Sequence, residues 1–249
     1  MSNALVVIPT YNEIENIEPL LRDIILLQRD FDILVVDDNS PDGTSAQVEQ
    51  LIKEYPDNIF LLKRTSKLGL GTAYIAGFKW ALKRHYDFIF EMDADFSHNP
   101  KDLLRLYSAC ENENCDMVIG SRYVTGVNVV NWPMNRVLLS WGASRYVRWI
   151  TGMKIDDTTA GFICYRRHVL EAINLDAIKF VGYAFQIEMK FRTWKHGFKI
   201  VEVPIIFQDR TAGASKMSKG IIKEAFIGVF LMKVKSWFTK YKQANEITN

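Results

Sequence analysis

The 249-residue chain is poor in cysteine, with only Cys110, Cys115 and Cys164. An odd number of cysteines without tight spacing argues against a disulfide framework and predicts a reducing compartment. A zinc site is not indicated, because no second pair of cysteines or histidines accompanies Cys110 and Cys115. The four histidines are isolated and form no convincing triad with a serine or cysteine. Function must therefore be sought in other residue types.

The sequence also lacks any run of the roughly 20 apolar residues that a membrane-spanning helix needs. The longest late candidate, Ala225 to Met232, is short and has lysines on both sides. Met1-Ser2-Asn3 leads directly into an apolar strand without a basic flank or cleavage site, so no signal peptide is expected. We expect a cytoplasmic protein that is soluble or peripheral on the cytoplasmic face of a membrane.

Acidic residues are missing from two stretches. Residues 117–155 contain none, and residues 216–242 contain seven lysines against Glu224 alone. Basic blocks most often form a solvated face. Mixed with tryptophan and phenylalanine, they also suit an anionic membrane surface. The cations of the first stretch are Arg122, Arg136, Arg145, Arg148 and Lys154.

What remains is an ordinary globular composition, 48% hydrophobic and 24% charged, in a chain long enough for one large α/β domain. Short apolar runs alternate with helical patterns through the first half, which predicts a parallel sheet covered by helices on both faces. The first run, Ala4 to Ile8, is expected to end at Pro9. Further strands are expected at 33–36, 59–62, 88–90, 117–119 and 200–203, and helices at about 16–24, 48–55, 72–85, 134–150, 185–196 and from 217.

Polar residues gather where three of these strands end. In parallel sheets ligands bind beyond the carboxyl ends of the strands, so these segments should meet at one site. The segments are Pro9-Thr-Tyr-Asn-Glu13, Asp37-Asp38 and Asp93-Ala94-Asp95.

Asp93 and Asp95 flank one small residue after a buried strand. Two carboxylates this close repel one another unless a cation lies between them, and Mg²⁺ or Mn²⁺ accepts such oxygens. Aspartate is also common in turns and helix caps, so the motif alone is weak evidence. The same segment, read as Asp-x-Asp-x-Ser after a strand, leaves a haloacid-dehalogenase-type phosphatase as an alternative from a different class of enzyme.

Two cationic segments suggest a phosphate. If residues 134–150 are helical, Arg136 and Ser140 share one face and could bind a phosphate, although a solvated arginine is the simpler interpretation. Farther on, Asp209-Arg210 and Lys216 bracket a glycine-containing loop that could close over a diphosphate. An ordinary basic surface loop is the alternative.

Several ordered motifs together resemble family 2 glycosyltransferases of the GT-A fold, and within them the dolichol- and polyprenol-phosphate mannose synthases. The resemblance runs from about residue 5 to about residue 220 and implies an α/β fold with a mostly parallel sheet flanked by helices. The motifs are Val7-Ile-Pro-Thr-Tyr-Asn-Glu13, residues 35–44, residues 67–74, residues 92–98, Gly120-Ser-Arg-Tyr123, Thr159-Ala-Gly-Phe162, Phe185-Gln-Ile-Glu-Met189, and Asp209-Arg210 with Lys216.

The resemblance implies a role for particular residues. It places the nucleoside and sugar diphosphate on Pro9, Tyr11, Glu13, Val36, Asp38, Asp93, Ala94, Asp95, Arg210 and Lys216. It places the metal, Mg²⁺ or Mn²⁺, on Asp93, Asp95 and Ser97, where Ser97 is a weaker ligand than the glutamine of some relatives. It assigns the acceptor phosphate to Arg122, Arg136 and Ser140, and catalysis to Asp95, Arg122, Arg210 and Lys216.

These assignments imply inverting transfer of mannose from GDP-mannose to the phosphate of a polyprenol or dolichol. A UDP-glucose-dependent glucosyltransferase acting on the same acceptor is an alternative. Residues 1–216 would form the catalytic domain and residues 217–249 a basic amphipathic helix. Relatives often carry C-terminal membrane helices, so this chain would reach the membrane through that helix or through a membrane-embedded partner subunit. Nucleic acid is not an expected partner.

Overall fold

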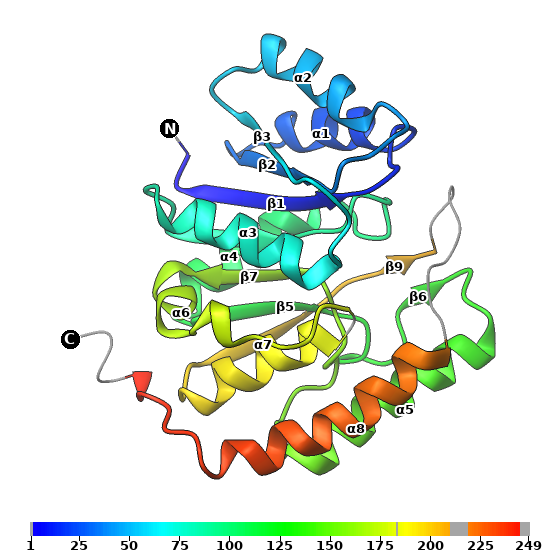
Figure 1. The fold of residues 1–249 in the computed structure, drawn as a ribbon, viewed down its shortest axis with the longest axis vertical. Helices are drawn as coiled ribbons and strands as arrows, with labels where there is room; N and C mark the ends of the chain where they lie inside the picture. The colour runs from blue at the N-terminus through cyan, green and yellow to red at the C-terminus, as the bar shows by residue number, and fades with distance from the viewer. Residues whose placement is uncertain (1, 183, 210–218, 245–249) are drawn as a thin grey trace.

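The computed structural model describes residues 2–182, 184–209 and 219–244. Strands and helices alternate along the chain (Figure 1). The strands are β1 (Ala4–Thr10), β2 (Asp32–Asp37), β3 (Ile59–Lys63), β4 (Phe88–Glu91), β5 (Met117–Ser121), β6 (Val129–Val130), β7 (Ile163–Arg166), β8 (Ile200–Pro204) and β9 (Phe207–Gln208). The helices are α1 (Ile17–Ile25), α2 (Thr44–Glu54), α3 (Leu70–Leu82), α4 (Asp102–Asn112), α5 (Met134–Thr151), α6 (Arg167–Ala172), the 3-10 turn η1 (Leu175–Ala177), α7 (Ala184–Lys195) and α8 (Lys219–Ser236).

A seven-stranded sheet forms the centre of the molecule, in the order β3-β2-β1-β4-β7-β5-β8. All neighbouring strands are parallel except β7, which runs antiparallel to both β4 and β5. The parallel sheet is as expected, but β7 was not predicted. By separating β4 from β5, it places the loop after β4 opposite the loop after β5.

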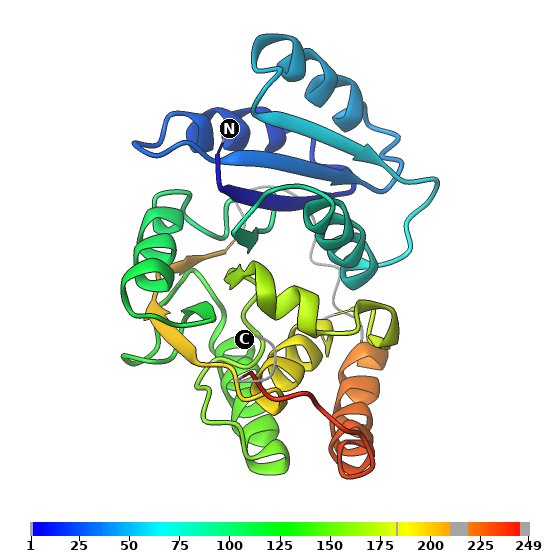
Figure 2. The ribbon, with the colours of Figure 1, turned by 90° about the vertical axis from the view of Figure 1, so that its left-hand side faces the viewer.

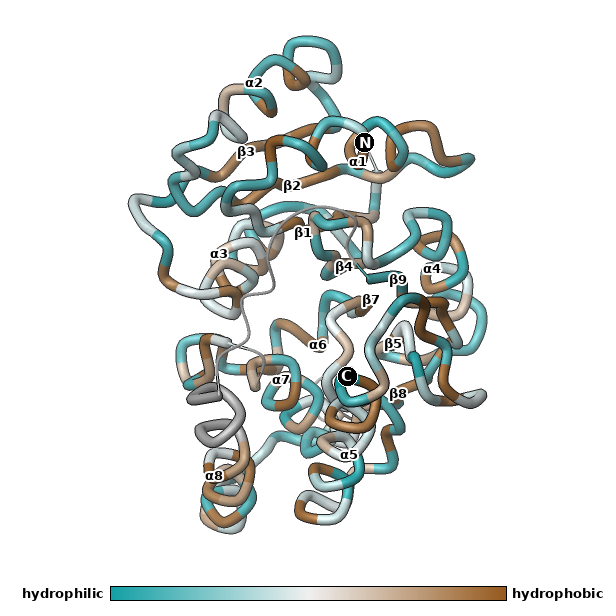
Figure 3. The backbone as a smooth tube through the Cα atoms, turned by 90° about the vertical axis from the view of Figure 1, so that its right-hand side faces the viewer, coloured by the Kyte–Doolittle hydropathy of each residue, from teal (hydrophilic) through white to brown (hydrophobic). Residues whose placement is uncertain are grey.

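Helices cover both faces of the sheet (Figures 1 and 2). Alternate residues of β1 point to opposite faces, so Leu5 and Val7 pack with α3, α6 and α7, while Val6 and Ile8 pack with α1, α2 and α4. Apolar colour accordingly follows β2 and β3, whereas the outer helix α2 is largely hydrophilic (Figure 3). This two-faced burial explains why the strands read as continuous apolar runs.

The prediction that the first strand ends at Pro9 is wrong, since β1 continues to Thr10. Val7 accepts a hydrogen bond from Met92 after β4, whereas Thr10 accepts one from Asp38 after β2. Residues of β1 with odd numbers therefore face β4, whose pairing with β1 ends at Val7. Pro9 has no backbone N–H to donate, but at this position β4 no longer pairs with β1, so no hydrogen bond of the sheet is lost.

Helices α5 and α8 lie side by side at the end of the molecule opposite α1 and α2 (Figure 1). The Tyr146 ring stacks on Phe226 at 4.0 Å, and its hydroxyl donates to the Phe226 carbonyl. Lys233 Nζ donates to the Thr151 carbonyl at 2.8 Å. Within the described part of the chain, no helix combines the length and apolar character needed to cross a membrane.

Candidate functional site

The first part of the site lies at the carboxyl ends of β1 and β2. Pro9 pairs with Val36 in register, and Asp38 follows one residue beyond β2. The Asp38 carboxylate forms an ion pair with Arg64 at 3.2 Å and accepts from the Leu68 amide. Burial raises the pKa of Asp38, an effect that Arg64 opposes. The structure thus brings three residues of the predicted nucleoside site together.

Tyr11 and Glu13, the other residues predicted to bind the nucleoside, lie in the loop after β1. Lys67 Nζ lies 4.0 Å from the centre of the Tyr11 ring, which ties this loop to the one before α3. The Glu13 amide donates to Thr44 Oγ1 at the start of α2. Loops after β1, β2 and β3 therefore converge at one edge of the sheet.

Asp37 holds the turn between β2 and α2. Its carboxylate accepts from the hydroxyls of Thr10, Ser40 and Ser45 and from the Ser40 amide. Burial alone would raise the pKa of Asp37, but these bonds hold it below its ordinary value of 3.8. The aspartate before Asp38 is therefore structural.

The second part of the site follows β4. Phe96 has a left-handed backbone, with φ of 56°, which is uncommon for a bulky residue and marks a tight loop. Asp95 Oδ1 accepts from the Ser97 amide within this loop. The Ser97 hydroxyl is buried and has no hydrogen-bond partner among the described residues.

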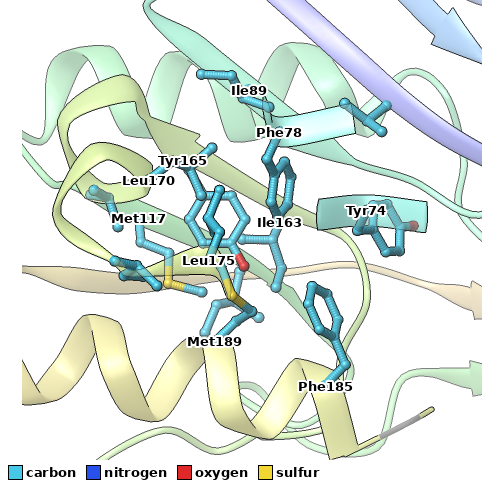
Figure 4. Packing of buried hydrophobic residues seen from close by; sticks show 14 of the residues in the cluster. Tyr74, Phe78, Ile89, Met117, Ile163, Tyr165, Leu170, Leu175, Phe185 and Met189 are labelled. Atoms are coloured by element: carbon cyan, nitrogen blue, oxygen red, sulfur yellow. The ribbon is translucent and has the colours of Figure 1, made fainter. Parts of the chain in front are cut away.

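Neighbouring side chains fix the carboxylate of Asp93. The Tyr74 hydroxyl lies 3.3 Å from Asp93 Oδ1, and the Tyr74 ring stacks on Phe185. His98 Nδ1 accepts from the Asp93 amide at 3.4 Å, and the imidazole stacks on Phe162. Burial lowers the pKa of His98 to about 4, so the ring is neutral near neutral pH. Figure 4 shows Tyr74 and Phe185 side by side within the core.

These residues fit a divalent cation. Asp93, Asp95 and Ser97 line the same cavity, and the partnerless hydroxyl of Ser97 is an oxygen donor suited to Mg²⁺ or Mn²⁺. No group of three or more His, Cys, Asp or Glu side chains suited to a metal occurs among the described residues. Two carboxylates and a hydroxyl leave coordination positions for the oxygens of a diphosphate.

A cavity of about 440 Å³ joins this loop to the predicted acceptor residues. Arg122, Arg136 and Ser140 line it together with Asp93, Ala160 and Gly161. Of the residues predicted for the nucleoside, Pro9, Tyr11, Glu13, Val36 and Asp38 lie outside its lining. The cavity therefore connects the diphosphate end of the predicted site with the acceptor end.

Arg122 is buried beside an aspartate that the sequence analysis did not single out. Its Nε and Nη2 atoms donate to the two oxygens of Asp157 at 2.7 and 2.6 Å, and Nη2 also donates to Thr159. The ion pair keeps the pKa of Asp157 below its ordinary value although burial opposes this. Such a bidentate pair holds the guanidinium rigidly at the cavity wall.

Arg136 lies on the first turn of α5. Its guanidinium packs over the Trp132 ring at 4.1 Å and forms an ion pair with Asp209 at 2.7 Å. Ser140, one turn along the helix, also lines the cavity. The Trp132 indole N–H is a buried donor without a partner among the described residues. The sequence analysis assigned no role to Trp132.

Beneath the cavity lies a buried polar group that links α7 to the sheet. Gln186 Nε2 and the Tyr165 hydroxyl both donate to the Glu91 carboxylate. Burial raises the pKa of Glu91 to about 7, while Gln186, Lys190 and Tyr165 favour the ionised form. Lys190 Nζ donates to the Ala160 carbonyl at 2.6 Å.

The far end of the cavity is apolar and lies between α5 and α8. Its lining there includes Leu139, Tyr146, Val147, Phe226 and Val229. Arg210 and Lys216, the cations predicted to close over the diphosphate, lie outside the described residues. The structure thus brings Asp93, Asp95, Ser97, Arg122, Arg136 and Ser140 to one cavity. The roles assigned to the predicted site residues stay predictions.

Carboxylates at the ends of parallel strands, beside a cavity lined by cations, define the class of GT-A nucleotide-sugar transferases, and solved structures agree on the fold. A mannosyltransferase from Pyrobaculum calidifontis, solved with GDP-Man and Mn²⁺, has a TM-score of 0.61 at 18% identity, covering 98% of this chain and 66% of its own. Glucosyl-3-phosphoglycerate synthase from Mycobacterium tuberculosis, solved with Mn²⁺ and UDP, has a TM-score of 0.64 at 17% identity, covering 95% and 80%.

The chain belongs to glycosyl transferase family 2, whose model matches residues 5–173. It is 48% identical over 233 residues to the polyprenol monophosphomannose synthase of Mycolicibacterium smegmatis, covering 94% of this chain and 86% of that protein. It is 51% identical over 229 residues to the undecaprenyl-phosphate mannosyltransferase of Micrococcus luteus, covering 90% and 91%. The phosphatase alternative is therefore wrong.

Proposed function

We propose that this enzyme transfers mannose from GDP-mannose to the phosphate of a polyprenol, with inversion at the anomeric carbon. The observation that carries the proposal is the single cavity that joins Asp93 and Asp95 to Arg122 and Arg136 and then continues between apolar helices. A cavity with a predicted diphosphate site, a second cationic site and an apolar end fits a phosphorylated lipid as the acceptor better than it fits a sugar hydroxyl. The two relatives near 50% identity are named for such acceptors.

The reaction joins two phosphates across one carbon. An oxygen of the lipid phosphate attacks the anomeric carbon of mannose, the bond to the diphosphate breaks, and GDP leaves with the electron pair. A phosphate monoester has its second pKa at about 6, so the nucleophile is already largely ionised near neutral pH and needs no general base. Among the described residues that line the cavity, His98 is the only histidine. Its ring is neutral and accepts a hydrogen bond from the Asp93 amide, which agrees with a reaction that needs no general base.

The remaining task is electrostatic. Asp93, Asp95 and Ser97 would hold Mg²⁺ or Mn²⁺, and the ion would supply positive charge for the departing diphosphate. Arg122, fixed by Asp157, and Arg136 hold the attacking phosphate in line, with Ser140 as a further donor. Arg210 and Lys216 add positive charge on the diphosphate side. Pro9, Tyr11, Glu13, Val36 and Asp38 bind the nucleoside at the ends of β1 and β2.

The acceptor requires contact with a membrane, and the α5–α8 end of the molecule supplies a suitable surface. We name the following exposed side chains the apolar face: Met134, Leu138, Trp141, Trp149, Phe226, Ile227, Phe230, Leu231, Trp237 and Phe238. The exposed cations Arg145, Lys235 and Lys240 accompany them and suit anionic lipid headgroups. Residues 1–216 thus act as the catalytic unit and residues 217–249 as a membrane-associated segment, peripheral on the cytoplasmic face.

Asp95→Ala and Arg136→Ala separate the two ends of the cavity. We expect each to lower turnover by about 10²–10³-fold, because each removes a charge that is used in the transition state. The measurement is transfer of labelled mannose from GDP-mannose to a short polyprenyl phosphate, extracted into organic solvent. Lys53→Ala, which removes an exposed cation on α2, serves as the matched control. Turnover near wild type in both cavity variants would contradict the mechanism.

The donor base is tested by binding alone. We expect GDP with Mn²⁺ to raise the melting temperature more than UDP with Mn²⁺, because the proposed donor is a guanosine nucleotide. At equal concentration, the ligand that binds the native state more tightly stabilises it more. Stronger protection by UDP would favour the UDP-glucose alternative.

A further inference from the structure

Gln186 lies on the first turn of α7 and forms part of the cavity floor, although only 3% of its surface is exposed. A Cβ atom added to Gly161 would lie 3.5 Å from Gln186 Nε2 and 3.9 Å from Asp93 Oδ2. The amide and the Asp93 carboxylate therefore flank the same glycine. This position is beside the diphosphate end of the cavity.

The orientation of the Gln186 amide follows from its partner. Its Nε2 atom donates to Glu91, whose other oxygen accepts from the Tyr165 hydroxyl at 2.9 Å. In the ionised form, which Gln186, Lys190 and Tyr165 favour, the Glu91 carboxylate accepts hydrogen bonds and so selects the NH₂ end of the amide. The oxygen Oε1 is consequently turned away from Glu91.

That oxygen is buried and accepts no hydrogen bond from any described residue. Leaving a buried acceptor unsatisfied costs about 1–3 kcal/mol, so native proteins rarely do so without a reason. An acceptor held rigidly at a cavity wall is suited to a ligand that brings a donor. A hexose presents several hydroxyl donors.

The hexose of the donor must lie between the diphosphate and the attacking phosphate. Gln186 and Gly161 line the same cavity as Asp93 and Arg122, and Gly161 adjoins both the Gln186 amide and the Asp93 carboxylate. Gly161 has no side chain, so the nitrogen end of the amide is left uncovered on that side. The hydrogen bond to Glu91, which Tyr165 fixes in turn, holds the Gln186 amide in place.

We propose that Gln186 recognises the donor sugar by accepting a hydrogen bond at Oε1 from one hydroxyl of the hexose. Glu91 is then a positioning residue that fixes the amide, and Gly161 leaves space beside the amide and the Asp93 carboxylate. The inference rests on the proposed transfer of a hexose and adds to it a residue that selects among hexoses. A site built to accept from a hydroxyl discriminates strongly against a sugar lacking it.

The experiment compares Gln186→Met with wild type on GDP-mannose and on each of its monodeoxy analogues. Methionine keeps a similar length but has no amide. We expect wild type to lose about 10–100-fold in kcat/KM on one analogue, and the variant to lose a similar factor on GDP-mannose, because each change breaks the same hydrogen bond. On that one analogue the two enzymes should agree within about threefold. Affinity for GDP with Mn²⁺ should not change.

Gln28→Met, at an exposed position beyond α1, is the matched control and should behave as wild type with every donor. A uniform loss by Gln186→Met on all donors, or a weaker affinity for GDP, would show a framework role and overturn the proposal. Wild-type turnover of GDP-mannose tests the proposed function separately. An enzyme that uses another hexose donor is compared with the deoxy analogues of that donor.

Discussion

At the scale of single residues, two adjacent aspartates after β2 have different environments. Asp37 accepts four hydrogen bonds and is fully buried, whereas Asp38 has an ion pair with Arg64 and adjoins the predicted nucleoside site. A sequence motif presents the pair as equivalent carboxylates. The structure assigns the first to the fold, and the second remains the candidate for ligand binding.

Asp37→Asn should destabilise the protein by about 1–3 kcal/mol near neutral pH, because an amide cannot accept all four hydrogen bonds. The pKa of Asp37 is depressed, so its stabilisation is complete above the ordinary value of 3.8 and is lost as the pH falls through the lower value of the folded state. Urea unfolding at a series of pH values should show the deficit of the variant shrinking in acid. Asp23→Asn, at an exposed position on α1, should show no deficit at any pH.

Residue patterns predicted the site unevenly. Asp93, Asp95 and Arg122 belong to motifs, and Arg136 shares a predicted helix face with Ser140. The fold brings all of them to one cavity. Asp157, by contrast, has no local signature, because its role arises only when the loop after α5 reaches Arg122. The free oxygen of Gln186 could not be predicted either, since it depends on the distant partner Glu91. Pairing across long sequence separations decides such details.

At the scale of elements, the buried strands and long helices followed from apolar periodicity, but β7 did not. It has four residues and pairs only with strands distant in sequence, so tertiary pairing rather than a local pattern defines it. Helix α4 was also not predicted, although Leu103, Leu106, Tyr107 and Cys110 show helical spacing. The strands β6 and β9 have two residues each, which is too short for an alternation of apolar and polar residues to be recognised.

Helix α3 approaches the sheet closely at Gly77. A Cβ there would lie 2.4 Å from Val7 Cγ1, so Gly77→Ala should destabilise the protein by about 1–3 kcal/mol through overpacking. On α5, Gly142 has nothing within 4 Å of its added Cβ, so Gly142→Ala should stabilise by about 0.5–1 kcal/mol through helix propensity. Chemical denaturation of both variants measures the two effects. If both variants changed the free energy of unfolding in the same direction, the close approach of α3 to β1 would be contradicted.

At the scale of the whole molecule, the helices α5 and α8, which carry most of the apolar face, lie at the end opposite α1 and α2 (Figure 1). Trp149 is 81% exposed there, and Leu26, after α1, is 80% exposed at the other end. Trp149→Glu should weaken binding to anionic vesicles about tenfold, because a tryptophan that enters the interface is replaced by a charge. Leu26→Glu is the matched control and should bind as wild type. Co-sedimentation with vesicles distinguishes them, and equal loss in both would contradict a role for this face.

The position of the cavity between α5 and α8 has a kinetic consequence. If the apolar face rests on lipid, the helices that line the apolar end of the cavity contact the layer in which the acceptor diffuses, and the enzyme searches for the acceptor in two dimensions. The relevant acceptor concentration is then the fraction of lipid molecules that carry it, not the amount per volume of solution. Adding inert lipid at constant total acceptor would slow the bound enzyme, while the water-soluble donor would still follow its bulk concentration. The rate would thus depend on the surface fraction of the acceptor and on the bulk concentration of the donor.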